Sequence, residues 1–382
     1  MQFNFFFILI LMNSLYFISN EPLNNSSYYN TPISKELLSQ LTIIDDYKDF
    51  AFGSQLGSNN PCEDTFFIQN ITLLNTSGIF FAVFDGHGGN KLSQYANLLL
   101  YPYFLEAFNI NKFIINFNNR LILSLNQAYA RIEQEFLKIA FNERLKNNYA
   151  FSQVGTCALS VIIINKKIFV ANLGDSKARL FYLSHKYMKK RNDTAQMKVK
   201  KLSKVFNIRK KEEQIYYKQK FPKDKDIIKC YNEKACYVKG ALQPTRTLGD
   251  YTMKYLHFNL DNVNKDFLYE KYQKYFNGPY ISSIPDIQVI DIKKNFRYLI
   301  IGTDGLWDVM KSREIASFIM DNKVNNIENI TYHLFNNALI NYSVENNFNG
   351  DYMEILKTPR GKQRRNLHDD ITIITCDLTK FF

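Results

Sequence analysis

Carboxylate side chains occur at four places where a predicted strand of this sequence ends in a turn: Glu63-Asp64; Asp85, directly after FFAVF; Asp304 and Asp308, directly after YLIIGT; and Asp369-Asp370. A strand end fixes a carboxylate in position while its oxygens face solvent. Converging carboxylates raise each other's pKa unless cations lie between them. Oxygen ligands suit Mg²⁺ or Mn²⁺ and disfavour zinc. The sequence therefore predicts a divalent-metal site.

The turn Asp85-Gly86-His87-Gly88-Gly89 carries further chemistry. Gly86 has no side chain, so its own carbonyl can approach an ion closely. Gly88 and Gly89 allow a sharp turn into a helix that begins near Asn90. His87 is suited to donate a proton to a leaving oxygen near pH 7. The alternative is an idle ring at a helix N-terminus.

Short apolar runs alternate with helical patterns, and a hairpin turn is expected at Asn165-Lys166-Lys167. Because several strands follow one another through short turns, antiparallel sheets and an α+β fold are favoured over a doubly wound parallel sheet. The expected strands are Ile79–Phe84, Cys157–Ile164, Ile168–Leu173, Ala178–Leu183, Tyr298–Ile301 and Ile371–Asp377. The expected helices are Lys91–Phe108, Lys112–Phe141, Ser312–Asn322 and Ile327–Asn341.

The charge of the chain is concentrated in one segment. The sequence has 382 residues, 46% of them hydrophobic, which excludes global disorder, and a formal charge of +12. Residues 186–239 contain 18 Lys/Arg and 6 Asp/Glu and so hold the whole surplus. A solvated or phosphate-attracting insertion, residues 184–239, is favoured over a nucleic-acid site.

The N-terminus and the cysteines bear on the compartment. Residues 3–18 are almost wholly apolar, which is short for a membrane span but typical of a signal-peptide core. A secretory signal or membrane anchor over residues 1–20, with membrane contact through residues 3–18, and a plain hydrophobic helix both stay open. A polar linker, residues 21–45, would follow. The five cysteines are odd in number and irregularly spaced, so a disulfide framework is not expected.

The ordered motifs resemble those of the metal-dependent protein phosphatases (PPM family, type 2C). The matching segments are Glu63-Asp64, FAVFDGHGG, VGTCALSVIII, ANLGDSKARL, QPTRTLGD, IIGTDGLWDVM and HDDITIIT. The resemblance implies a phosphatase domain over residues 46–380, built as an α/β/β/α four-layer sandwich of two antiparallel sheets. It implies a monomeric enzyme that hydrolyses phosphoserine and phosphothreonine with Mg²⁺ or Mn²⁺. NNPCED and VKGALQPTRTLGD further resemble the pyruvate dehydrogenase phosphatase-like branch.

By motif match, the resemblance also assigns roles to single residues. Asp85 would bridge two ions, and the Gly86 carbonyl would bind the second. Asp304 and Asp369 would bind the first, and Glu63, with Asp64 beside it, would hold the second through water. Asp175 and Asp308 match positions linked to a weaker third ion, and His87 matches the proposed general acid.

One position departs from many relatives, which carry a phosphate-binding arginine four residues before Glu63. Asn59 stands there in this chain. Arg246 or the Lys-rich insertion is the alternative source of positive charge for substrate phosphate, although Arg246 could equally be structural. Two other classes stay open, a silent scaffold and a two-metal nuclease. The intact Asp85, Asp304 and Asp369 oppose the first, and the motif order opposes the second. The N-terminus favours a secretory or membrane-associated location, with the cytoplasm as alternative.

Overall fold

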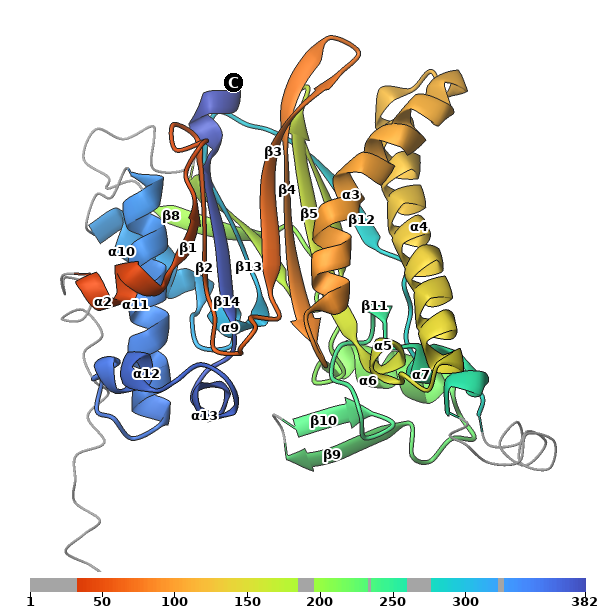
Figure 1. Cartoon of the computed structure of the whole chain (residues 1–382). Coiled ribbons are helices and arrows are strands. Elements are labelled where there is room, and N and C mark those ends of the chain that lie inside the picture. The colour runs from red at the N-terminus through yellow and green to blue at the C-terminus, as the bar shows by residue number, and fades with distance from the viewer. Residues whose placement is uncertain (1–32, 185–195, 233–234, 260–275, 322–325) are drawn as a thin grey trace, which may run out of the picture.

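Two antiparallel six-stranded sheets pack face to face, with helices on both outer sides (Figure 1). The computed structural model describes residues 33–184, 196–232, 235–259, 276–321 and 326–382. The first sheet has the order β1 (Thr42–Ile44), β2 (Ala51–Leu56), β14 (Ile371–Asp377), β13 (Phe296–Gly302), β7 (Lys177–Leu183), β8 (Met197–Lys201). The second has the order β12 (Asp286–Asp291), β6 (Lys167–Leu173), β5 (Gly155–Ile164), β4 (Thr76–His87), β3 (Thr65–Leu73), with β11 (Leu248–Gly249) paired to β5. The expected α+β sandwich is confirmed.

Three apolar layers hold the sandwich together. Side chains such as Phe81, Val161 and Leu299 fill the space between the two sheets. The second sheet is covered by α3 (Lys91–Ile110) and α4 (Phe117–Leu145). The first is covered by α10 (Ser312–Asp321) and α11 (Ile327–Glu345). The other helices of the described residues are α2 (Lys35–Gln40), α5 (Ala150–Gln153), α6 (Lys211–Lys220), α7 (Tyr251–Lys254), α9 (Asp304–Trp307), α12 (Met353–Lys357) and α13 (Lys362–Arg365).

The predicted strands are confirmed because they are the ones buried on both faces. All ten residues of β5 are buried, since helices lie on one side and the other sheet on the other. Such strands appear in sequence as continuous apolar runs. The turn between β5 and β6 is also as expected, with Asn165 and Lys166 at φ of 52° and 57°, the left-handed pair that a two-residue hairpin requires.

The four expected helices form, with corrected boundaries: α3, α4 and α11 end at Ile110, Leu145 and Glu345 rather than at Phe108, Phe141 and Asn341. The helix expected from Lys112 begins at Phe117, because the Asn116 side chain accepts a hydrogen bond from the Asn119 N–H and caps it. Residues Asn111–Phe113 form a separate 3₁₀ turn.

The basic segment, residues 184–239, is partly built into the fold. β8 pairs with β7 and forms an edge of the first sheet. Its sequence MKVKK kept it from being predicted as a strand, although lysines are common on edge strands. The rest of the segment includes α6 and a hairpin of β9 (Ile228–Asn232) and β10 (Ala235–Val238).

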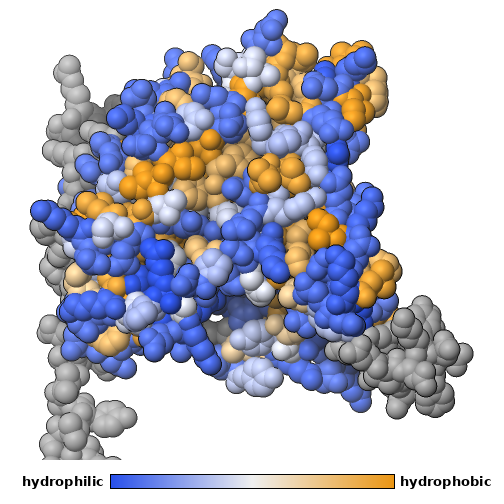
Figure 2. Space-filling model, in the orientation of Figure 1, coloured by the Kyte–Doolittle hydropathy of each residue, from blue (hydrophilic) through white to orange (hydrophobic). Residues whose placement is uncertain are grey.

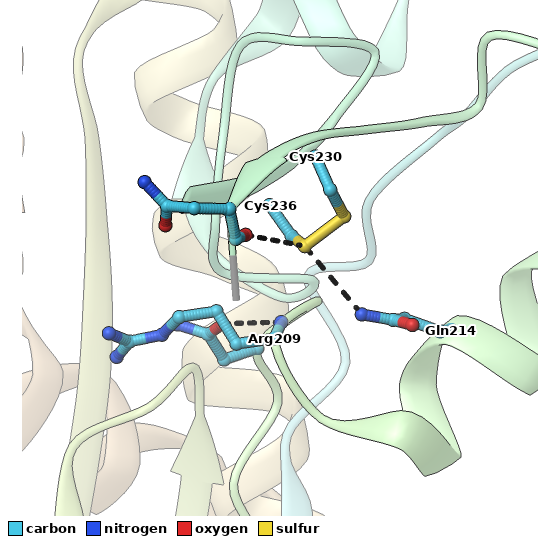
Figure 3. The surroundings of a disulfide bond; sticks show 6 residues. Arg209, Gln214, Cys230 and Cys236 are labelled. Carbon is cyan, nitrogen blue, oxygen red and sulfur yellow. Dashed lines mark hydrogen bonds between the residues drawn. A yellow bond between two sulfur atoms is a disulfide. The ribbon is translucent and has the colours of Figure 1, made fainter. Parts of the chain in front are cut away.

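A disulfide joins Cys230 and Cys236 across this hairpin, which the cysteine spacing did not suggest (Figure 3). The antiparallel register sets the two residues opposite each other, with Cα atoms 4.0 Å apart. Cys62, Cys157 and Cys376 are free thiols. The single bridge is therefore local and leaves the sandwich held by its apolar core.

The expected signal or anchor segment, residues 1–20, lies outside the described residues. Among the described residues, no helix is both long and apolar enough to span a membrane. In the view of Figure 2, the lower half of the face is mostly hydrophilic and contains a recess. The ends of β4 and β13 and the short helix α9 lie toward this lower end in the same orientation (Figure 1).

Candidate metal centre

Asp85, Asp175 and Asp304 converge at one end of the sandwich. One carboxylate oxygen of each lies within 4.8 Å of those of the other two. Asp85 stands near the end of β4, Asp175 in the turn between β6 and β7, and Asp304 at the start of α9. The Asp304 N–H also donates to the Asp85 carboxylate over 3.3 Å. Each sheet therefore contributes to the cluster.

The electrostatics of this cluster favour bound cations. Burial, followed by the charges of Asp304 and Asp64, raises the pKa of Asp85 well above its usual range. Burial and Asp369 do the same to the pKa of Asp304. The pKa of Asp369 is raised to about 6, with burial as the largest cause. Like charges held this close are relieved by a cation between them.

The donor set fits the hard divalent ions predicted from the sequence. The clustered ligands are carboxylate oxygens, which suit Mg²⁺ and Mn²⁺. Asp85, Asp304 and Asp175 are the residues that would hold such ions most directly. Asp369 lies outside the tight group of three but is close enough for its charge to raise the pKa of Asp304.

Glu63 and Asp64 are placed by a loop that is tied to Asp370. The Asp370 carboxylate accepts hydrogen bonds from the backbone N–H groups of Ser58, Asn59 and Glu63 at 2.6, 2.9 and 2.8 Å. Burial raises the pKa of Asp370, but these hydrogen bonds outweigh it and bring the pKa below its ordinary value. Asp370 is thus a scaffold carboxylate, and the adjacent Asp369 is the one turned to the cluster.

Asp64 joins the two sheets rather than facing solvent. Its carboxylate accepts from the Thr303 hydroxyl at 2.9 Å and from the Thr372 hydroxyl at 2.7 Å. Asp64 is buried, and burial with the nearby Asp370 raises its pKa well above the ordinary value. Glu63 is more open, and its pKa is raised by burial to a lesser degree.

Gly86 has no room for a side chain. A Cβ at this position would lie 2.3 Å from the Glu63 carbonyl oxygen and 2.9 Å from the Ser93 hydroxyl. The close approach brings the Glu63 loop against the end of β4. The role of the Gly86 carbonyl as an ion ligand stays a prediction.

His87 forms an ion pair that the sequence did not reveal. Its Nε2 lies 2.8 Å from one Asp250 carboxylate oxygen and 3.0 Å from the other. Burial lowers the pKa of His87, but the charge and hydrogen bond of Asp250, together with the nearby charges of Asp175 and Glu63, outweigh burial, so the net shift is upward. The Thr247 hydroxyl donates to Asp250 at 2.6 Å and fixes its orientation. Asp250 lies within the QPTRTLGD motif, which was the available signal.

A glycine makes this pair possible. The register of β4 and β5 sets Gly155 opposite His87. A Cβ on Gly155 would lie 2.1 Å from an Asp250 oxygen and 2.3 Å from His87 Nε2. Asp250 itself has a left-handed φ of 51°. The missing side chain of Gly155 and the left-handed backbone of Asp250 thus allow the Asp250 carboxylate to reach the imidazole.

Asp175 and Asp308 have protein partners of their own. Asp175 accepts from the Asn207 amide at 2.6 Å and from the Cys157 thiol at 3.2 Å. Asp308 accepts from both terminal nitrogens of Arg209 at 3.1–3.2 Å. The guanidinium of Arg209 extends away from the disulfide hairpin (Figure 3). It thus places a positive charge where a weaker third ion was expected.

Arg246 and Asn59 are both occupied by protein contacts. Arg246 donates to the Ile284 carbonyl at 2.6 Å, and its guanidinium lies 3.7 Å from the centre of the Phe206 ring. Asn59 donates through its side-chain amide to Asp370 at 3.0 Å and to Glu63 at 3.2 Å. These contacts leave Arg246 in a structural setting next to the segment that follows β8.

The sandwich and its acidic cluster define a metal-dependent hydrolase architecture, and comparisons with known proteins agree. The protein phosphatase 2C family matches residues 48–348. The chain is 28% identical to probable protein phosphatase 2C 79 of Arabidopsis thaliana, over 86% of this chain and 82% of that protein. It is 27% identical to probable protein phosphatase 2C 28 of Oryza sativa subsp. japonica, over 83% and 74%.

Solved structures show the same fold. The serine-threonine phosphatase 2C of Toxoplasma gondii superposes with a TM-score of 0.54 at 16% identity, over 88% of this chain and 98% of that one. A C. elegans sex determining protein gives 0.56 at 17% identity, over 86% and 64%. The chain belongs to the protein phosphatase 2C family. It is a metal-dependent protein serine/threonine phosphatase.

Proposed function

We propose that this phosphatase works with two divalent ions, Mg²⁺ or Mn²⁺, held by Asp85, Asp304 and Asp369, with Asp175 completing the cluster. The Gly86 carbonyl and Glu63, with Asp64 behind it, would serve the second ion. The observation that carries the proposal is the convergence of Asp85, Asp175 and Asp304, which have carboxylate oxygens within 4.8 Å of one another. When bound, such ions make water a better nucleophile and offset charge on a phosphoryl group.

The protein's own residues then assist the leaving oxygen of the scissile phosphorus–oxygen bond. The phosphorus–oxygen bond to the serine or threonine side chain breaks as water adds to phosphorus. The departing oxygen needs a proton, and His87 is the group suited to donate it. Asp250 holds the imidazole in place and favours its protonated form. The water releases its proton to solvent, and His87 regains one before the next turnover.

A third ion at Asp308 would compete with a protein cation. Asp308 is paired with Arg209, so an ion would have to displace that guanidinium. Arg246 stays a prediction as a substrate-binding residue, since its contacts with Ile284 and Phe206 support a structural role as well.

Two further proposals concern the branch of the family to which the chain belongs and the molecules that it binds. NNPCED and VKGALQPTRTLGD support a place near the pyruvate dehydrogenase phosphatase-like branch. We propose a monomeric enzyme that acts on phosphoproteins without binding nucleic acid, because the basic surplus lies in one segment that is partly built into the fold. Membrane contact through residues 3–18 and the division into residues 1–20, 21–45 and 46–380 stay proposals. The described part of the second segment contains α2 and β1, so a linker there would end before Lys35.

The first experiment measures phosphate release from a phosphothreonine peptide by the full chain. Mg²⁺ and Mn²⁺ are compared, and each is then removed with excess EDTA. We expect release with either ion and none after chelation. Absence of release from protein shown to be folded and metal-loaded would overturn the proposed mechanism and favour a silent scaffold.

A further inference from the structure

Among the described residues, Lys177, Arg209 and Arg365 are basic side chains whose charges interact with the clustered aspartates, and the first two have further protein contacts. Both terminal nitrogens of Arg209 bond Asp308. Lys177 points its ammonium at the Trp307 carbonyl, 3.5 Å away. Arg365, at the end of α13, is the third. Arg365 is therefore the one of these three cations to consider as a binding group for an anion at the cluster.

Arg365 combines proximity with exposure. One terminal nitrogen lies 2.7 Å from an Asp369 carboxylate oxygen, while 45% of the Arg365 side chain remains exposed. Asp369, Asp304 and Asp85 all act on its charge, so the guanidinium lies beside the metal-binding carboxylates. Among the described residues, the Asp369 pair is the only side-chain contact of Arg365 that the structure records. No hydrogen bond of the other guanidinium N–H groups is recorded among the described residues, and the exposed part of the side chain makes these donors accessible to a ligand.

The backbone that carries Arg365 is fixed. The Gly361 N–H donates to the Ser58 carbonyl at 2.7 Å, and the Arg365 N–H donates to the Gly361 carbonyl at 2.9 Å. The neighbouring Arg364 is buried and anchors the turn to Thr358 at 2.7 Å and to Gln40 at 2.6 Å. α13 lies at the same end of the sandwich as α9, which begins at Asp304 (Figure 1).

We propose that Arg365 binds the phosphate of the substrate and of the product at the metal centre, an inference that rests on the proposed function. A guanidinium with free N–H donors matches the oxygens of a phosphate monoester, and it can bond two of them at once. The Asp369 contact aims the guanidinium, and its remaining donors hold the phosphate against the ions. Arg365 is thus a substrate-binding residue for phosphoserine and phosphothreonine.

A purely structural role for Arg365 predicts the opposite pattern. If Arg365 only positioned Asp369, its removal would weaken metal binding and leave phosphate affinity at saturating metal unchanged. If it binds phosphate, its removal weakens phosphate binding. Loss of a positive charge next to a metal ligand then leaves Mg²⁺ affinity the same or higher.

The test uses the full chain with Arg365→Ala and Arg365→Lys, and Lys362→Ala as the matched control. Lys362 is an exposed cation on the same helix, so its loss removes the same charge. Titration calorimetry at pH 8 measures Mg²⁺ binding, and then inorganic phosphate binding to the Mg²⁺-loaded protein. Steady-state kinetics with a phosphothreonine peptide give KM, kcat and the inhibition constant of phosphate.

For Arg365→Ala we expect phosphate affinity to fall about 10- to 100-fold and KM to rise by a similar factor. Mg²⁺ affinity should not fall, Arg365→Lys should recover part of the loss, and Lys362→Ala should resemble wild type. Unchanged phosphate affinity, or an equal loss in Lys362→Ala, overturns the proposal. Because the phosphate titration needs no turnover, it decides the role of Arg365 even if the chain proves inactive on peptides.

Discussion

At the scale of single residues, the clustered carboxylates destabilise the metal-free protein by mutual repulsion and act as ligands when a cation is bound. Beyond burial, the Asp304 charge raises the pKa of Asp85, and the charges of Asp369 and Asp175 raise the pKa of Asp304. Removing one carboxylate therefore removes a ligand and a repulsion together. Activity and metal-free stability should respond to the same substitution in opposite directions.

Asp304→Asn tests the ligand half of this argument. The amide keeps the shape of the side chain but loses its charge, so we expect kcat/KM for a phosphopeptide to fall at least ~100-fold, which corresponds to about 2.7 kcal/mol of lost ion-dependent stabilisation. Steady-state assays over a range of Mn²⁺ check it. Asp46→Asn, a change at an exposed aspartate, is the control. Retention of most of the metal-dependent turnover would show that Asp304 is not a ligand.

Asp250→Asn tests the proton donor. Because Asp250 raises the pKa of His87 against the effect of burial, the asparagine variant should lower that pKa. The protonated imidazole then becomes scarce at lower pH than in wild type, so the alkaline limb of the kcat profile shifts to lower pH. We expect about a 10- to 100-fold loss with a phosphothreonine peptide.

The leaving group supplies the control for Asp250→Asn. The nitrophenolate of p-nitrophenyl phosphate departs without a proton, so its hydrolysis should suffer much less. Equal losses on both substrates would mean that Asp250 stabilises the fold and does not act through His87. Thermal melting of the variant measures any loss of stability.

At the scale of elements, burial decides what could be predicted. The runs that became β4, β5, β6 and β14 are apolar because both of their faces are covered, and expected carboxylates lie at one end of β4 and one end of β14. The edge strands β8 and β12 have exposed, charged residues and show no such pattern. The sequence therefore indicated the middle of each sheet better than its edges.

The contacts within the metal site were also only partly predictable from the sequence. The sequence marked Asp369 and Asp370 as a pair, but only the fold shows that one faces the cluster and the other accepts hydrogen bonds from the Ser58–Glu63 loop. The pairing of His87 with Asp250 spans 163 positions and depends on a left-handed residue and an opposing glycine. Contacts of that range leave no periodic pattern in the sequence.

Asp370→Asn tests the link between elements. Asp370 ties the loop that leaves β2 to the start of β14, and an amide cannot accept all of its hydrogen bonds. We expect a loss of about 1–3 kcal/mol in the free energy of unfolding, together with weaker metal binding through the displaced Glu63. Urea unfolding of metal-free protein and titration with Mn²⁺ measure the two effects. A variant as stable as wild type would contradict the scaffold role.

At the scale of the whole molecule, the cluster makes stability depend on pH and metal together. A carboxyl whose pKa is raised on folding stays protonated in the folded state where the unfolded chain is already ionised. For Asp369 this window runs from an ordinary value of 3.8 to about 6. The destabilisation is absent below the window, grows through it and is fully present above it.

Metal reverses this dependence, because ions bind the ionised carboxylates and displace their protons. The difference in Tm between Mn²⁺-loaded and metal-stripped protein should therefore increase from pH 5.5 to pH 8, and calorimetry in two buffers of different ionisation enthalpy should detect proton release on binding. In stripped protein at pH 8, Asp304→Asn should raise Tm by a few degrees, since it removes one buried charge from the cluster. That gain should shrink toward pH 5 as the carboxyls of the wild type take up protons. A pH-independent gain would mean that packing, and not the shared negative charge, determines the stability of the metal-free centre.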